Sequence, residues 1–161
     1  MNDSKRADSR YQSSVCVAKA CLVVVLLSIV GWPIVAPLAA NAEEVVVIVP
    51  RNSTVDALSK TGLRAIFGMR SRTWPQGDAI KVFVLKDDDP VHATFTKEIL
   101  HTFPFNLRRI WDRQVYSGTG QAPNVVKTEE EMRVKISITK NSIGYISRDR
   151  VDKEVKVVNL Q

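Results

Sequence analysis

Two segments of the sequence combine polar side chains with backbone N–H groups that could bind a small anion. The first consists of Arg51, Asn52, Ser53 and Thr54. The second consists of Ser117, Gly118, Thr119 and Gly120. The first follows a predicted strand and precedes a predicted helix, where α/β proteins collect ligands and helix N-termini hold anions. The glycines of the second could form an anion nest. Helix capping for the first segment and a flexible connector for the second remain open as alternatives.

Other residues that could bind a metal ion are better explained by structural roles. The run Asp87–Asp89 could suggest calcium, but the glycine and the later glutamate of a calcium-binding loop are missing. We predict that Asp89 caps a helix, because a proline follows it. His92 and His101 are nine residues apart on that helix and so lie on different faces, which does not suit a shared metal ion. We predict that both are surface residues.

Enzymatic function has little support in the sequence. It contains no glycine-x-serine-x-glycine elbow and no histidine-rich metal motif. Ser142 and Tyr145 lie in a predicted strand with no obvious base nearby. Arg108, Arg109 and Arg113 could form a basic docking patch or simply the solvated face of a helix. We therefore predict a non-enzymatic protein without cofactor or metal.

The first 42 residues resemble an export leader. A basic start precedes the apolar run Cys21–Val30, which is too short to span a bilayer, and Ala40-Asn41-Ala42 has the small-x-small pattern of a cleavage site. We predict a signal peptide at 1–42 and a periplasmic domain at 43–161. An uncleaved membrane anchor is the alternative.

Both cysteines lie in the leader, which also carries four cations and two anions. The formal net charge of +6 therefore falls to +4 in the domain. This surplus favours anionic partners. No basic stripe interleaved with aromatic residues indicates nucleic acid.

Strands and helices are expected to alternate along the domain. Strands are predicted at 45–49, 80–85, 143–146 and 154–158, the first as a central strand of a parallel sheet. Helices are predicted after Ser53 or Thr54, after Thr61 up to Gly68, after Asp89, after Asn106 with Leu107, Ile110, Trp111 and Val115 inward, and at 128–138. The last segment also alternates like a strand, but Thr128-x-x-Glu131 is a capping box. Trp74 and Trp111 are predicted packing residues. The pattern indicates an α/β domain.

Several segments, in order, resemble the phosphate ABC transporter substrate-binding family. They are Val47-Ile48-Val49-Pro50-Arg51-Asn52, Leu63-Arg64-Ala65-Ile66-Phe67-Gly68, Trp74 with Gly77, Phe95, Trp111, Ser117-Gly118-Thr119-Gly120 before Pro123, and Ser142-Ile143-Gly144-Tyr145. The resemblance covers nearly all of 43–161 and corresponds to one lobe of a two-lobed receptor. It implies a single three-layer lobe of the periplasmic-binding-protein type, with a mixed sheet flanked by helices, and a small oxyanion such as phosphate as ligand.

One segment departs from the family pattern. After the strand at 80–85, family members carry an arginine and a glycine-serine-glycine-threonine turn that grips phosphate. Here the segment is Lys86-Asp87-Asp88-Asp89-Pro90-Val91-His92, which places carboxylates where the anion would sit. Two functions follow from the resemblance and this departure. One is weak or absent binding of a small anion by the lobe, and the other is an envelope protein interaction module that has lost its ligand.

Overall fold

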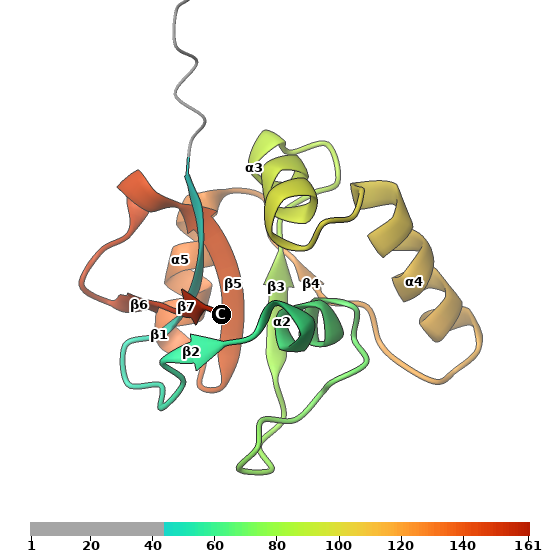
Figure 1. The fold of residues 1–161 in the computed structure, drawn as a ribbon, viewed down its shortest axis with the longest axis horizontal. Helices are drawn as coiled ribbons and strands as arrows, with labels where there is room; N and C mark the ends of the chain where they lie inside the picture. The colour runs from blue at the N-terminus through green and yellow to red at the C-terminus, as the bar shows by residue number, and fades with distance from the viewer. Residues whose placement is uncertain (1–43) are drawn as a thin grey trace, which may run out of the picture. The chain divides into compact units, whose positions relative to one another are not determined.

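The apolar run at 45–50 forms a central strand, as the sequence predicts. The computed structural model describes residues 44–161 and contains a five-stranded sheet in the order β4-β3-β5-β1-β6 (Figure 1). All six residues of β1 (Val45–Pro50) are buried. The prediction that this strand belongs to a parallel sheet is wrong, because β1 is antiparallel to both β5 (Ser142–Ser147) and β6 (Val155–Val157). A run of apolar residues requires cover on both faces and says nothing about strand direction.

The remaining strands make the sheet mixed. Strand β3 (Lys81–Val84) is parallel to β5 and to the short edge strand β4 (Asn124–Val125). The carboxyl ends of β3, β4 and β5 therefore meet at one edge of the sheet, which we call the carboxyl edge. The carboxyl end of the antiparallel β1 lies at the opposite edge, which we call the amino edge.

Helices and a second small sheet surround this sheet. The helical segments are α2 (Lys60–Phe67), α3 (Pro90–Thr94), its π-helical continuation η1 (Phe95–Ile99), α4 (Pro104–Tyr116), α5 (Glu129–Ile138) and the 3-10 turn η2 (Arg148–Arg150). Strands β2 (Ala57–Leu58) and β7 (Asn159–Leu160) form a two-stranded parallel sheet. Within residues 44–161, no helix combines the length and the apolar character needed to cross a membrane.

Two neighbouring residues of β5 show the three layers. A Cβ atom on Gly144 would lie 2.6 Å from Sδ of Met132 and 3.2 Å from Cδ1 of Ile136, so this face packs against α5. The next residue, Tyr145, points to the other face. Its ring stacks on Phe95 with centroids 3.8 Å apart and lies 5.8 Å from the ring of Phe67 in α2. The fold is thus an α/β lobe with α5 on one face of the mixed sheet and α2, α3 and η1 on the other, as predicted.

Two helix starts follow from local hydrogen bonds. Oγ1 of Thr128 accepts from the N–H of Glu131 at 3.1 Å, and the carboxylate of Glu131 accepts from the N–H of Lys127 at 2.9 Å. The helical interpretation of residues 128–138 is therefore confirmed. Helix α2 ends at Gly68 as predicted, but its N-cap is Ser59 rather than Thr61, with its Oγ 3.0 Å from the N–H of Gly62.

Two other expectations are wrong. No helix follows Ser53. Its hydroxyl accepts from the N–H of Val55 at 3.2 Å, and the chain then enters β2, which pairs with β7 at the end of the chain. Helix α4 begins at Pro104 rather than after Asn106, and Val115 is 46% exposed instead of inward. The inward face of α4 consists mainly of the buried Leu107 and Trp111.

The core of the domain is formed by residues between Val45 and Val158. These residues belong to one compact unit that ends at Gln161. Residues 44–161 therefore share one connected hydrophobic core. The predicted leader at 1–42 lies outside the described residues.

Candidate functional site

The turn that follows β3 at the carboxyl edge starts helix α3 with its own carboxylate. Oδ1 of Asp89 accepts from the N–H of Val91 at 2.8 Å and from the N–H of His92 at 3.4 Å. Pro90 occupies the first helical position, where its missing N–H costs nothing. The predicted capping role of Asp89 is confirmed. The N–H groups that begin α3 consequently already have an anionic partner from within the chain.

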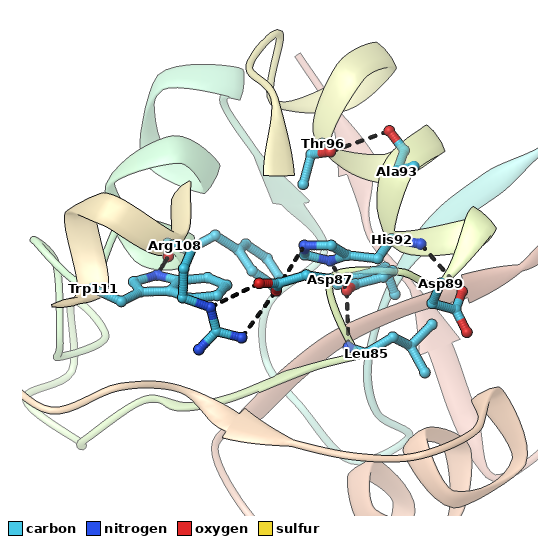
Figure 2. Close-up of polar contacts among 10 residues, drawn as sticks. Leu85, Asp87, Asp89, His92, Ala93, Thr96, Arg108 and Trp111 are labelled. Atoms are coloured by element: carbon cyan, nitrogen blue, oxygen red, sulfur yellow. Dashed lines mark hydrogen bonds and ion pairs between the residues drawn. The ribbon is translucent and has the colours of Figure 1, made fainter. Parts of the chain in front are cut away.

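A second carboxylate in this turn is held by an arginine of α4. Nε and Nη2 of Arg108 donate to the two carboxylate oxygens of Asp87 at 2.8 and 2.9 Å (Figure 2). The guanidinium carbon lies 5.3 Å from the ring centroid of Trp111, within cation–π range. The hydrogen bonds to Asp87 raise the pKa of Arg108 above its ordinary value. Trp111 is fully buried and donates from Nε1 to the carbonyl of Phe67 at 2.7 Å, which confirms its packing role.

A buried chain of polar groups runs beneath this ion pair. The N–H of Leu85 donates to the hydroxyl of Tyr145 at 2.9 Å, and that hydroxyl lies 2.5 Å from Nδ1 of His92. We assign the hydroxyl proton to this second contact, because the hydroxyl then uses both its donor and its acceptor. The proton of the neutral imidazole is consequently on Nε2, which lies 4.0 Å from Oδ1 of Asp87 (Figure 2). At that distance Nε2 has no hydrogen-bond partner among the described residues.

Two predictions about His92 and Tyr145 are wrong. His92 is 0% exposed rather than a surface residue, and it provides the base that seemed absent near Tyr145. Burial lowers the pKa of His92, against the opposing effect of Asp87 and Asp89, and burial raises the pKa of Tyr145 above its ordinary range. Since both side chains are sealed from solvent, the pair supports the core and does not face a substrate. His101, by contrast, is exposed as predicted.

The predicted segment Arg51–Thr54 lies at the amino edge. It does follow the carboxyl end of β1, but β1 runs against its neighbours, so this end is remote from the turn at Asp87–Asp89. Asn52, Ser53 and Thr54 line a pocket of about 300 Å³ together with the buried indole of Trp74 and other polar residues. Its charged lining residues are one cation and one anion, Lys140 and Asp78.

The predicted segment Ser117–Gly120 is tied to the end of α4. The N–H groups of its four residues donate to carbonyls of Arg113, Val115 and, twice, Gln114, at 3.0 to 3.1 Å. Gly118 has φ +66°, a conformation that favours glycine. These amides are therefore engaged within the protein. The two hydroxyls contact each other at 2.8 Å and lie within 3.5 Å of the carbonyl of Gln114, so they are engaged as well. The group that remains for a ligand is a neighbouring guanidinium.

That guanidinium belongs to Arg72, which donates to the carbonyl of Thr119. The two residues line a pocket of about 480 Å³ with Gly118 and Gly120, and its other lining residues are all uncharged. The pocket also borders Ile80, just before β3 begins, which places it on the amino side. The two predicted segments thus lie in separate pockets, and neither contacts the polar groups at the carboxyl edge. Nothing in the spacing of the sequence indicated the Asp87–Arg108 and His92–Tyr145 pairs.

Comparison with solved structures identifies the same architecture. A protein from Clostridium perfringens, described as a phosphate ABC transporter substrate-binding protein with bound phosphate, superimposes with a TM-score of 0.58 at 18% identity, over 72% of this chain and 44% of that chain. The resemblance is confirmed at the level of the fold. An ABC-type phosphate transport receptor from Vibrio cholerae has a TM-score of 0.54 at 17% identity, over 72% and 45% of the two chains. PstS from Borrelia burgdorferi has a TM-score of 0.55 at 16% identity, over 73% and 47%.

This chain spans less than half the length of these receptors, in agreement with a single lobe. No protein-family model matches the sequence, and no curated protein matches it. The likeness therefore shows that this chain has the α/β fold of one lobe of these receptors.

Proposed function

We propose that the protein is a periplasmic, non-enzymatic binding domain built on one lobe of the phosphate-receptor fold, with weak affinity for small oxyanions. The weak affinity rests on one observation: the carboxylate of Asp89 accepts hydrogen bonds from the first N–H groups of α3. The family resemblance assigns phosphate to this turn, and here an internal anion occupies it. The predicted leader at 1–42 supports the periplasmic location.

Electrostatics favours weak binding at the carboxyl edge. At an effective dielectric of about 20, a carboxylate about 4 Å from a phosphate charge opposes binding by about 4 kcal/mol. A helix N-terminus typically contributes about 0.3–1 kcal/mol, and up to about 2 kcal/mol when partly buried. Arg108 already forms an ion pair with Asp87. A phosphate at this turn would therefore have to displace two internal carboxylates.

We place the residual oxyanion affinity in the pocket of Arg72 and the Ser117–Gly120 segment. Arg72 bonds only backbone carbonyls, of Met69 and Thr119, so its charge has no carboxylate neighbour among the pocket residues. The pocket of the Arg51–Thr54 segment is the weaker alternative, because Asp78 balances Lys140 there.

Burial supports the non-enzymatic part of the proposal. The acid–base pair of His92 and Tyr145 is enclosed in the core, and the raised pKa of Tyr145 keeps its hydroxyl protonated. A general base must come within hydrogen-bond reach of its substrate. Neither group offers a substrate that access.

The test is a titration of residues 43–161 with phosphate and sulfate at low salt, followed by amide NMR and thermal unfolding. A ligand at a hundredfold excess over its dissociation constant should stabilise the domain by about 2.7 kcal/mol. We expect no such stabilisation at low millimolar phosphate, and shifts centred on Gly118–Gly120. Arg72→Gln should abolish these shifts, whereas Arg109→Gln, an exposed arginine on α4, should keep them. Tight binding with shifts centred on Val91 and His92 would refute the proposal.

A protein interaction module is the second candidate function. The internal carboxylates at α3 favour it, because they remove the ligand position that the resemblance implies. Independently, three arginines (Arg64, Arg70 and Arg113) that form no ion pair within residues 44–161 line an apolar groove beside α4, which also favours it. Its test is recovery of an envelope protein by the immobilised domain, with a dissociation constant that phosphate does not change.

A further inference from the structure

A groove runs between the end of α2 and helix α4. Two pockets of about 220 and 410 Å³ share Arg70 and Ile110, so they form one continuous depression. Leu100, Leu107 and Ile110 provide its apolar lining. The two helices are neighbours in the fold, with α4 to the right of α2 in Figure 1.

The charged residues of this groove all have the same sign. Its lining contains Arg64, Arg70, Arg113 and the titratable His101, and no carboxylate lines either pocket. Among residues 44–161, none of these arginines forms an ion pair, and all four side chains are exposed. Nε of Arg64 donates to the carbonyl of Leu100 at 2.8 Å, which holds this guanidinium at the rim. The cations thus surround an apolar surface without internal neutralisation.

Two exposed phenylalanines lie near the start of α4, close in sequence to the groove residues. Phe103 and Phe105 follow Thr102, a groove residue, and are 54% and 60% exposed. Their rings stack with centroids 5.9 Å apart. Aromatic residues and arginine are enriched in protein interfaces, whereas acidic residues are depleted. The lining of the groove, with its arginines and without carboxylates, agrees with this composition.

We propose that this groove docks an acidic segment of a partner protein that carries an apolar anchor side chain. The cationic rim supplies the charge complementarity, and the apolar lining gives the anchor a place to lose its hydration. The concave shape favours an inserted segment over the flat surface of a membrane. This inference rests on the second candidate function, and it names the surface and the chemistry of the partner.

The first experiment uses three labelled synthetic peptides of equal length, with binding to residues 43–161 measured by fluorescence anisotropy. One peptide alternates acidic residues with leucine, one replaces the acids by lysine, and one replaces the leucines by serine. We expect the acidic leucine peptide to bind, with an affinity that falls as salt increases. The other two should not bind. Equal binding of the lysine peptide would overturn the proposal.

The second experiment uses variants of the groove. The double variant Arg70→Glu with Arg113→Glu should weaken the acidic leucine peptide about tenfold or more, because two attractive pairs become repulsive. Arg109→Glu reverses one charge on α4 outside the groove and should retain the wild-type affinity. Ile110→Ser should weaken binding without changing its salt dependence. Equal effects of the Arg109 and Arg70/Arg113 changes would overturn the proposal.

Two further outcomes separate this inference from the functions proposed above. Binding of phosphatidylglycerol vesicles, but not of the acidic leucine peptide, would make the groove a membrane contact and overturn the proposal. An envelope partner recovered equally by the wild type and the Arg70/Arg113 variant would leave the interaction function standing and reject this groove.

Discussion

Replacing Tyr145 by Phe should destabilise the domain substantially, although only one oxygen atom is removed. That oxygen accepts from the N–H of Leu85 at 2.9 Å and lies 2.5 Å from Nδ1 of His92, and all three residues are buried. The phenyl ring can keep its stacking on Phe95, so the loss is polar. Each buried group left without a partner costs about 1–3 kcal/mol, and two are left, which gives about 2–6 kcal/mol. This is a large share of the roughly 5–15 kcal/mol that stabilises a typical domain.

Urea unfolding followed by circular dichroism measures this change, provided that the dependence on denaturant stays constant. Tyr116→Phe is the matched control, since Tyr116 is 89% exposed and should change the free energy of unfolding by less than about 0.5 kcal/mol. A Tyr145→Phe variant as stable as this control would refute the reasoning, because the buried polar chain would then contribute nothing to the fold.

Three further predictions concern the same core. Burial lowers the pKa of His92 below 6.5, so the unfolded chain takes up a proton at a higher pH than the folded domain does. The free energy of unfolding should therefore decrease as the pH is lowered from about 6.5, by at most about 1.4 kcal/mol per pH unit. Denaturant titrations should show that His92→Gln loses this slope and that His101→Gln keeps it. Asp87→Asn removes a nearby carboxylate and should lower the pKa of His92 further in an NMR titration, while changing stability by less than about 1 kcal/mol, since the ion pair is half-exposed. An unchanged or raised pKa would contradict it. Gly144→Ala should cost about 1–3 kcal/mol in thermal or urea unfolding, because the added methyl would overlap Met132; an unchanged stability would show that α5 packs less closely.

Elements that depend on neighbouring residues were predictable. The carboxylate of Asp89 and the hydroxyl of Thr128 bond N–H groups two or three positions onward, so the start of each helix is encoded in a few residues. The burial of β1 follows from its unbroken apolar run. The ordered family segments led to the correct lobe without any single motif being specific.

Elements that depend on distant residues were not predictable in the same way. The segment after Ser53 has capping residues suited to a helix, but its pairing with β7 decides its structure. The ligand-binding interpretation of Arg51–Thr54 placed it with the other carboxyl ends of the sheet. The antiparallel direction of β1 puts it at the other edge, and no local pattern specifies that direction.

The sequence by itself determined the composition of the domain, its missing cysteines, its cationic surplus and the acidic turn before α3. It also determined the helix starts, because their hydrogen bonds join atoms within a few residues. Only the tertiary structure decided that His92 is buried against Tyr145, 53 positions away, and that the arginines of α2, α4 and the turn after α2 share one groove. The physical reason is that burial and charge pairing depend on distances through space. These distances are set when the sheet and its helices pack together.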